Sequence, residues 1–183
     1  MIDLLSLHKY FLSAHIKEGD TVADFTMGNG NDTLWLSNAV GENGKVYSFD
    51  IQESALTNTR KRLEENGAPE NYTLILDSHS NLANYIEGTI KAGVFNLGYL
   101  PGADKSKTTL RQTTYLAVTG AMEKLGEDGV LLVAVYPGHE EGALEGEMLY
   151  DTLSKYSRFS FCISKFQIIN SPTSPYFFLI EKK

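Results

Sequence analysis

The segment from Thr21 to Thr33 constrains the possible fold more than any other part of the chain. It opens with β-branched and aromatic residues that favour a half-buried strand. Two glycines, Gly28 and Gly30, then flank an asparagine, and this combination accommodates positive φ angles and ends the strand. Asp32 and Thr33 are expected to cap the helix that follows. Such a unit lets a ligand approach the backbone and directs helix N–H groups towards it, although Gly-x-Gly also occurs in ordinary tight turns.

A carboxylate on the next expected strand narrows the class of ligand. The strand Lys45–Asp50 ends in an acid about 20 residues after the glycine turn, within reach of a ribose bound over that turn. A dinucleotide site requires a third glycine three positions after Gly30, but that position holds Thr33. The carboxylate of Asp24, on the first strand, would repel a phosphate, so it suits a ligand that has none. The pattern therefore favours S-adenosylmethionine over NAD.

The rest of the chain alternates between helical and strand patterns. Helices are expected over residues 3–16, 34–40, 52–67, 81–87, 108–125 and 140–156, and strands over 21–25, 45–50, 72–77, 92–98, 129–136, 159–167 and 176–181. This alternation predicts an α/β fold, with a parallel sheet and helices on both faces. The last two strands are too close together for a parallel crossover, so they should form an antiparallel hairpin at one edge. The length of the chain fits one domain, residues 1–183.

Composition and charge limit the partners. The net charge of −7 argues against broad, sequence-independent binding of nucleic acid. The segment 104–111 is locally basic, however, so Lys105, Lys107 and Arg111 could hold a folded RNA; the alternative is a solvated start of a helix. The single cysteine, Cys162, excludes an internal disulfide and is expected to be buried. Without a cluster of Cys and His, no metal site is expected.

Hydropathy indicates a chain that does not enter membranes. No apolar run reaches the roughly 20 residues needed to span a bilayer. The first residues lack the basic region and the cleavage site of a signal peptide. We therefore expect a reducing, cytoplasmic location. The sequence does not distinguish a monomer from a homodimer.

The order of these elements resembles that of the class I S-adenosylmethionine-dependent methyltransferases over essentially the whole chain. The matching positions follow the strands in turn: Asp24-x-x-x-Gly28-x-Gly30, Asp50, Asp77 and Asn96-Leu-Gly-Tyr99-Leu-Pro101. The last motif is similar to the Asn/Asp-Pro-Pro-Tyr tetrapeptide of many amino-group methylases, but leucine and glycine stand where the prolines would be. The resemblance implies a Rossmann-like, mostly parallel, seven-stranded sheet with an antiparallel C-terminal hairpin.

Longer motifs resemble one small bacterial family, long labelled rRNA methylases. They are Asp24-x-Thr26-Met27-Gly28-Asn29-Gly30-x-Asp32-Thr33, Asn96-Leu-Gly-Tyr-Leu-Pro-Gly-x-Asp104-Lys105, Tyr136-Pro-Gly-His139-x-x-Gly142 and Asn170-x-Pro172. This resemblance implies methylation of the exocyclic amine of 5-aminomethyl-2-thiouridine at the wobble position, with the anticodon loop of tRNA as the partner. Asn31 departs from the family pattern, in which a histidine is expected, so no catalytic role is assigned to it.

The candidate site follows from these motifs. Asn96 is expected to orient the amine, Tyr99 to stack on the uracil or contact the amine, and Asp32 to accept a proton; turn capping, loop packing and helix capping are the respective alternatives. Contacts with RNA are expected from Tyr99, Lys105, Lys107, Arg111 and His139. Contacts with S-adenosylmethionine are expected from Asp24, Thr26, Met27, Gly28, Asn29, Gly30, Asn31, Asp32, Thr33, Asp50, Ile51, Gln52, Asp77, Ser78, His79 and Asn96.

Three classes of function are compatible with the sequence. The first is a tRNA amine methyltransferase, with an rRNA methyltransferase as its variant. The second is a small-molecule or protein N-methyltransferase on the same fold, which the acidic charge favours. The third is a nucleotide-binding module without catalysis; Asn96 and Tyr99 argue against it because a pure binder needs neither. His8 and His15, on the first helix, are expected to be structural.

Overall fold

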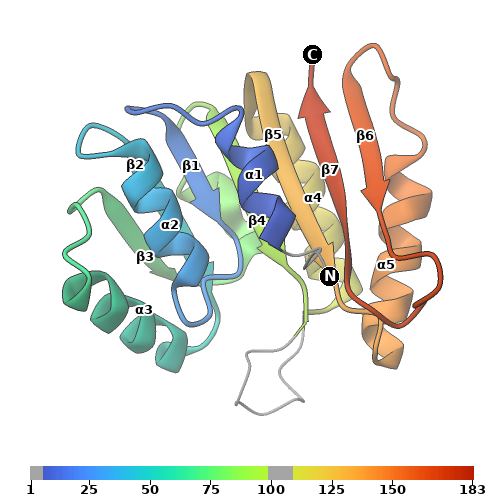
Figure 1. Ribbon diagram of the computed structural model, residues 1–183, viewed down its shortest axis with the longest axis horizontal. Coiled ribbons are helices and arrows are strands. Elements are labelled where there is room, and N and C mark those ends of the chain that lie inside the picture. Colours follow the sequence, from blue (N-terminus) through green and yellow to red (C-terminus); the bar gives the residue numbers. More distant parts are fainter. Residues whose placement is uncertain (1–5, 99–108) are drawn as a thin grey trace.

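The computed structural model describes residues 6–98 and 109–183, whose strands all join one sheet (Figure 1). In chain order the elements are α1 (Leu7–Ser13), β1 (Thr21–Asp24), α2 (Asn31–Val40), β2 (Lys45–Asp50), α3 (Glu53–Glu65), β3 (Tyr72–Leu76), the 3-10 helix η2 (His79–Asn84), β4 (Ile90–Asn96), α4 (Arg111–Lys124), β5 (Leu125–Val135), α5 (Glu140–Leu153), β6 (Phe161–Phe166) and β7 (Tyr176–Lys182). The alternation of strand and helix predicted from the sequence is therefore confirmed.

The strands lie in the order β3-β2-β1-β4-β5-β7-β6. Strands β1 to β5 run parallel, β7 pairs with β5 antiparallel, and β6 pairs with β7 antiparallel at the edge. The mostly parallel sheet and its antiparallel C-terminal hairpin are thus confirmed. The strand order reverses between β1 and β4, and ligands of such sheets bind in the crevice at the carboxyl ends of the strands beside this reversal.

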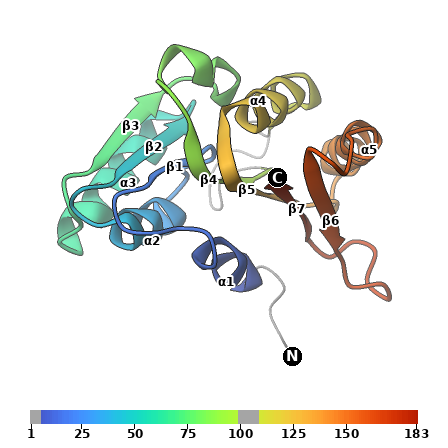
Figure 2. The same cartoon turned by 90° about the horizontal axis from the view of Figure 1, so that it is seen from above.

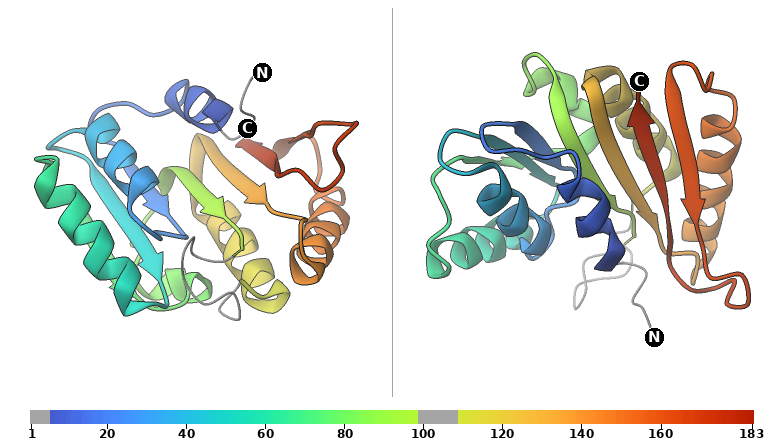
Figure 3. Two further views of the ribbon diagram at one scale, coloured as in Figure 1. Left: turned by 60° about the horizontal axis from the view of Figure 1, so that its bottom comes forward. Right: turned by 45° about the horizontal axis from the view of Figure 1, so that its top comes forward.

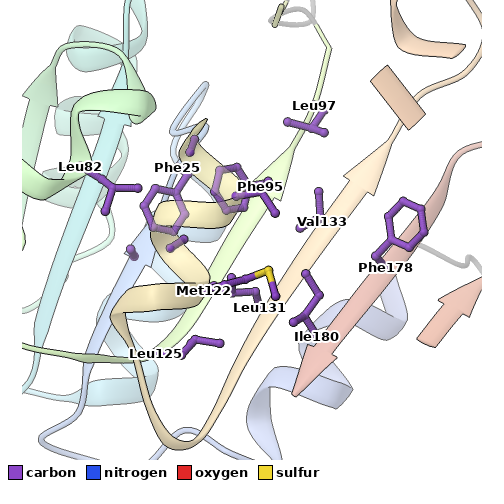
Figure 4. Close-up of a cluster of buried hydrophobic side chains, with 14 of the residues drawn as sticks. Phe25, Leu82, Phe95, Leu97, Met122, Leu125, Leu131, Val133, Phe178 and Ile180 are labelled. Atoms are coloured by element: carbon purple, nitrogen blue, oxygen red, sulfur yellow. The ribbon is translucent and has the colours of Figure 1, made fainter. Parts of the chain in front are cut away.

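Helices cover both faces of the sheet, with α1 and α2 on one side and α4 and α5 on the other (Figure 2). Because side chains alternate along each strand, the strands contribute to two apolar clusters. One cluster contains Phe25 and Phe95, whose stacked rings are 4.3 Å apart between centroids, together with residues of η2, α4 and α5 (Figure 4). The other contains Val22 and Val94 with residues of α1 and α2. The apolar run of β5 is buried on both faces, as predicted.

Three details differ from the expectations. Helix α1 spans Leu7–Ser13, which is shorter than the expected range of 3–16, and residues 1–5 lie outside the described part of the chain. Strand β5 begins at Leu125 rather than at residue 129, so it follows α4 without a loop. Cys162 is exposed, not buried, because it lies on the edge strand β6, whose side chains are at most partly covered.

Candidate active site

The glycine turn after β1 leads directly into α2. Gly30, with a φ of 76°, is the N-cap, and the helix begins at Asn31. Asp32 and Thr33 therefore lie inside the first turn and do not cap the helix, which corrects the expectation. A Cβ on Gly30 would lie only 2.8–2.9 Å from atoms of Thr59 on α3. This glycine is thus required by its backbone angle and by the close packing of α3 against the turn.

The buried carboxyl group of Asp24 lies at the end of β1, below the turn. It accepts hydrogen bonds from the Thr33 hydroxyl at 2.7 Å and from the Thr26 N–H at 3.1 Å. Burial, and after it the charge of Asp32, raises the pKa of Asp24 to about 7. Thr33 stands where a dinucleotide motif has its third glycine, and its hydroxyl holds this carboxyl group in place.

The carboxylate at the end of β2 is oriented by two backbone amides. Asp50 Oδ2 accepts the Gly28 N–H at 3.0 Å, and Oδ1 accepts the Gln52 N–H at 3.0 Å. Each carboxylate oxygen has a further lone pair, so the same group can also accept hydrogen bonds from two hydroxyls of a ribose. The structure places Asp50 beside the glycine turn, as the sequence predicts; its contact with a ribose stays a prediction.

Asp77 and His79, two of the predicted polar residues that follow β3, have different partners. Asp77 accepts hydrogen bonds from Asn81 and Tyr85, and these bonds lower its pKa. His79 is buried, and its Nδ1 lies 3.0 Å from the Phe25 carbonyl oxygen. Because a carbonyl only accepts, Nδ1 carries the proton, and burial lowers the pKa of the ring. The neutral His79 therefore offers Nε2 as a hydrogen-bond acceptor.

Three side chains from α1, α2 and β4 form a hydrogen-bonded row. Asn96 Nδ2 donates to Asp32 Oδ2 at 2.8 Å, and Asp32 Oδ1 lies 3.1 Å from His8 Nε2. Burial opposes the charge of Asp32, but contacts with His8, Asn96 and Lys9 outweigh burial and lower the pKa. An ionised carboxylate only accepts hydrogen bonds, so Asp32 binds the nitrogen of the Asn96 amide. Asn96 Oδ1 is consequently the acceptor that this side chain can offer.

A cavity of about 990 Å³ brings most of the predicted residues together at the carboxyl ends of the parallel strands, which point to one edge of the sheet (Figure 3). This volume lies at the upper end of the roughly 300–1,000 Å³ typical of small-molecule sites. The predicted residues that line it are Asp24, Thr26, Met27, Gly28, Asn29, Asn31, Asp32, Asp50, Ile51, Gln52, Asp77, Ser78, His79, Asn96 and His139.

The remaining predicted residues do not line the cavity or cannot be placed. Gly30 is the N-cap of α2, and Thr33 is buried in the first turn of that helix. Arg111 begins α4 beside the lining residues Leu110 and Thr113. Tyr99, Lys105 and Lys107 lie outside the described residues. Their predicted roles stay predictions.

Sequence reasoning missed part of the cavity wall. Among the lining residues that the sequence did not place at the site are His8 on α1, Tyr136 directly after β5, and Thr173 and Pro175 between β6 and β7. The motifs Tyr136-Pro-Gly-His139 and Asn170-x-Pro172 were the available signals for the last three. No local pattern distinguishes His8 from His15, so its position corrects the expectation of a purely structural role.

The wall at the start of α4 is held by a buried carboxyl group on α5. Glu145 accepts hydrogen bonds from the hydroxyls of Thr109 and Thr114. Thr109 in turn accepts the Gly98 N–H at 2.9 Å and donates its own N–H to the Gly98 carbonyl at 2.9 Å. The end of the β4 segment and the beginning of α4 are therefore fixed to each other and to α5.

Two residues expected to contact RNA have partners within the protein. His139 is the N-cap of α5, and its Nδ1 accepts the Gly142 N–H at 3.1 Å. Arg111 forms an ion pair with Glu141, with 3.0 Å between Nε and Oε1. Neither contact excludes RNA, because His139 lines the cavity and Arg111 is half exposed.

The cavity offers carboxylates, backbone amides, an amide side chain and an imidazole. Within residues 6–98 and 109–183, no group of three or more His, Cys, Asp and Glu side chains is arranged to hold a metal ion. None of the helices in the same part of the chain has the length and apolar character needed to cross a membrane.

The strand order, the glycine turn and the acids at the strand ends define the class I S-adenosylmethionine-dependent methyltransferase fold. The chain belongs to the family described as "Putative rRNA methylase", whose model matches residues 46–182.

The relatives agree with this family. A chloroplastic tRNA (mnm(5)s(2)U34)-methyltransferase from Arabidopsis thaliana is 35% identical over 178 residues, covering 92% of this chain and 65% of that protein. This chain thus spans just under two thirds of the length of that relative. A structure described as a putative rRNA-methylase from Clostridium thermocellum has a TM-score of 0.97 and 40% identity, covering 100% of this chain and 99% of that one. SMU.1697c from Streptococcus mutans, solved in complex with SAH, has a TM-score of 0.91 and 35% identity, covering 100% of this chain and 99% of that one.

Proposed function

We propose that the chain transfers a methyl group from S-adenosylmethionine to the exocyclic amine of 5-aminomethyl-2-thiouridine at the wobble position of tRNA. The observation that carries the proposal is the orientation of Asn96. Its Nδ2 donates to Asp32, so its Oδ1 is an acceptor at the cavity. An acceptor here can bind an N–H of an amine and direct the nitrogen lone pair. The name of the Arabidopsis relative specifies a modified uridine of this kind.

The donors and acceptors around the glycine turn fit S-adenosylmethionine. Asp50, held by two backbone amides, would bind the ribose hydroxyls. Asp77 and the neutral ring of His79 would flank the adenine, whose amino group needs an acceptor. When bound, S-adenosylmethionine supplies a methyl carbon that its sulfonium already activates. The SAH complex of the Streptococcus mutans relative supports this part of the proposal.

The chain's own residues have to handle the amine. A primary alkylamine has a pKa near 10, so it is mostly protonated at neutral pH, and only its neutral form is a nucleophile. Asn96 Oδ1 would hold one N–H, so that the lone pair points at the methyl carbon. Asp32, kept ionised beside Asn96, would stabilise the positive charge that develops on the amine nitrogen as it accepts the methyl group; with its lowered pKa it is too weak a base to hold the amine's proton. Tyr99 would stack on the uracil. Positioning and exclusion of water then supply most of the rate enhancement.

We also propose that residues 1–183 act as one methyltransferase domain in the cytoplasm on the anticodon loop of tRNA. The basic residues Lys105, Lys107 and Arg111 would contact phosphates of that loop. There are two alternatives: an rRNA methyltransferase, and a small-molecule or protein N-methyltransferase. An assay with different methyl acceptors distinguishes them from this function.

The test is methylation of defined acceptors by the purified protein. tRNA carrying 5-aminomethyl-2-thiouridine is incubated with methyl-labelled S-adenosylmethionine, and its nucleosides are identified by mass spectrometry. We expect one added methyl group on that nucleoside. Asn96→Ala should reduce single-turnover rates by about 10²-fold or more, with little change in cofactor affinity.

Matched controls sharpen the assay. Asn38→Ala removes an exposed asparagine from α2, the helix that carries Asp32, and should turn over at the wild-type rate. Ribosomal RNA and small primary amines serve as competing acceptors. Label on these acceptors alone, label on a ribose oxygen or ring carbon, or near-normal turnover of Asn96→Ala would contradict the proposal.

A further inference from the structure

The N-terminal helix α1 contributes a histidine to the cavity. The His8 side chain is only 12% exposed and lies 3.1 Å from the similarly enclosed carboxylate of Asp32. Helix α1 lies beside α2 on the same face of the sheet (Figures 1 and 3). It therefore forms part of the wall of the site as well as covering the sheet.

We infer that His8 is a positioning residue for the methyl acceptor, acting through Asp32 on Asn96. Asp32 is held at both oxygens, because Oδ1 contacts His8 and Oδ2 accepts the Asn96 amide. A carboxylate held at one oxygen only can rotate about its broad terminal torsion. With both oxygens engaged, its plane is set, and so is the direction in which Asn96 presents Oδ1. The inference rests on the proposed function, in which this oxygen orients the amine.

The other groups near Asp32 cannot replace His8 in this role. Lys9 Nζ is 3.7 Å from Oδ1, on a side chain that is 40% exposed, so it contributes charge but little direction. Asp24 repels the Asp32 carboxylate and is already bound to Thr33. Without His8, Asp32 would keep one directional partner among residues 6–98 and 109–183, the amide that it is meant to orient.

The backbone of Asn96 is held independently of His8. Its N–H donates to the Thr26 hydroxyl at 2.7 Å, and β4 is paired with β1 and β5 on either side. Removal of His8 should therefore disturb the side chain of Asn96 and leave the strand and the cofactor residues in place. This separation makes the inference testable by kinetics.

The experiment is a double-mutant cycle between His8→Leu and Asn96→Ala. Single-turnover rates are measured with tRNA carrying 5-aminomethyl-2-thiouridine and saturating S-adenosylmethionine. We expect His8→Leu to lower the rate about 10-fold or more, in the range of a small misplacement of reacting groups. In the Asn96→Ala background the same change should cost less than about 2-fold, because the group through which His8 acts is gone. His8→Gln, whose amide N–H can donate to Asp32, should recover part of the rate.

Two controls separate positioning from folding. His15→Leu removes the other histidine of this N-terminal segment, which contacts Asp128 and Glu181 away from the cavity, and should keep the wild-type rate. Affinity for S-adenosylmethionine, measured by calorimetry, should be unchanged in both His8 variants. If His8→Leu does not fold, the cycle is run with His8→Ala, which also removes the contact with Asp32.

Independent, multiplicative effects of the two changes, or a wild-type rate in His8→Leu, would overturn the inference while leaving the proposed function intact. A wild-type protein that methylates no amine-bearing tRNA would overturn the proposed function, and this inference with it.

Discussion

At the scale of single residues, two neighbouring carboxyl groups of the cavity have opposite environments. Burial raises the pKa of Asp24 to about 7. Asp32 is also partly buried, but its contacts with His8, Asn96 and Lys9 hold its pKa below the usual value. Two interacting acids whose pKa values are pushed apart do not need to be charged together. Asp32 is thus the carboxylate that stays ionised near neutral pH, while Asp24 can hold a proton there.

This difference predicts a pH dependence of stability. The pKa of Asp24 in the folded chain, about 7, lies above its ordinary value of 3.8. Folding therefore favours the protonated form, and this stabilisation is complete below the ordinary pKa and is lost as the pH rises through about 7. Asp24→Asn is neutral at every pH. We expect the free energy of unfolding of this variant, relative to wild type, to increase by about 2–3 kcal/mol between pH 5 and pH 8.

Urea unfolding at several pH values measures this change. Asp77→Asn is the control, because the pKa of Asp77 is lowered and its titration lies below this range. A difference between Asp24→Asn and wild type that stays constant with pH would show that Asp24 is ionised throughout.

At the scale of elements, the glycine turn is held by contacts with its neighbours in the fold. On α3, the Thr59 hydroxyl donates to the Gly28 carbonyl at 3.2 Å, and Arg62 Nε donates to the Asn29 carbonyl at 2.6 Å. On the opposite side, the Gly28 N–H is bound by Asp50 at the end of β2. The turn is thus preorganised by protein contacts, which reduces the entropy that a ligand would have to overcome on binding.

Gly30→Ala should separate backbone strain from the packing of α3. A residue with a Cβ in the left-handed region costs about 1–2 kcal/mol. At Gly30 the new Cβ would also overlap Thr59, at 2.9 Å from its Cα. At Gly67, with a φ of 59°, nothing lies within 4 Å. We expect Gly30→Ala to lower the free energy of unfolding clearly more than Gly67→Ala and to weaken binding of S-adenosylmethionine.

Urea unfolding and calorimetry of the two variants test this prediction. Equal destabilisation by the two alanines would mean that α3 can move away from the new Cβ without lowering the free energy of unfolding. The turn would then need glycine for its backbone angle alone.

At the scale of the whole molecule, the proposed function requires a chain of net charge −7 to bind tRNA, which is a polyanion. Binding must then depend on a local group of cations, because the overall field repels RNA. Arg111, at the start of α4, is the described member of the predicted group, and its partner Glu141 neutralises part of its charge. The ion pair places a competing anion where a phosphate would bind.

Replacing Lys105, Lys107 and Arg111 together with alanine should weaken tRNA binding and make its salt dependence shallower, by about 0.7–0.9 in slope for each phosphate that the protein no longer neutralises. Glu141→Gln is the opposite change and should strengthen binding, because it removes the competing anion from Arg111. Filter binding over a range of salt concentrations gives both slopes, and affinity for S-adenosylmethionine should not change in the triple variant. An unchanged slope would place the RNA surface elsewhere, with Lys155, Arg158 and Lys165 as the next candidates.

Much of the fold and part of the site were determined by the sequence itself. The spacing of apolar residues and the turn-forming residues are local signals, so they predicted the alternating elements, the parallel sheet and the terminal hairpin. Because parallel strands bring their carboxyl ends to one edge, the acids Asp24, Asp50 and Asp77 and the amide of Asn96 could be expected to lie together.

The tertiary structure alone decided how these groups are held. The position of His8 depends on how α1 lies against α2, and the need for Gly30 depends on the approach of Thr59 from α3. The orientation of the Asn96 amide and the tautomer of His79 depend on single hydrogen bonds to residues 64 and 54 positions away. Such contacts leave no periodic pattern in the chain, because side chains brought together by packing need no fixed spacing in sequence.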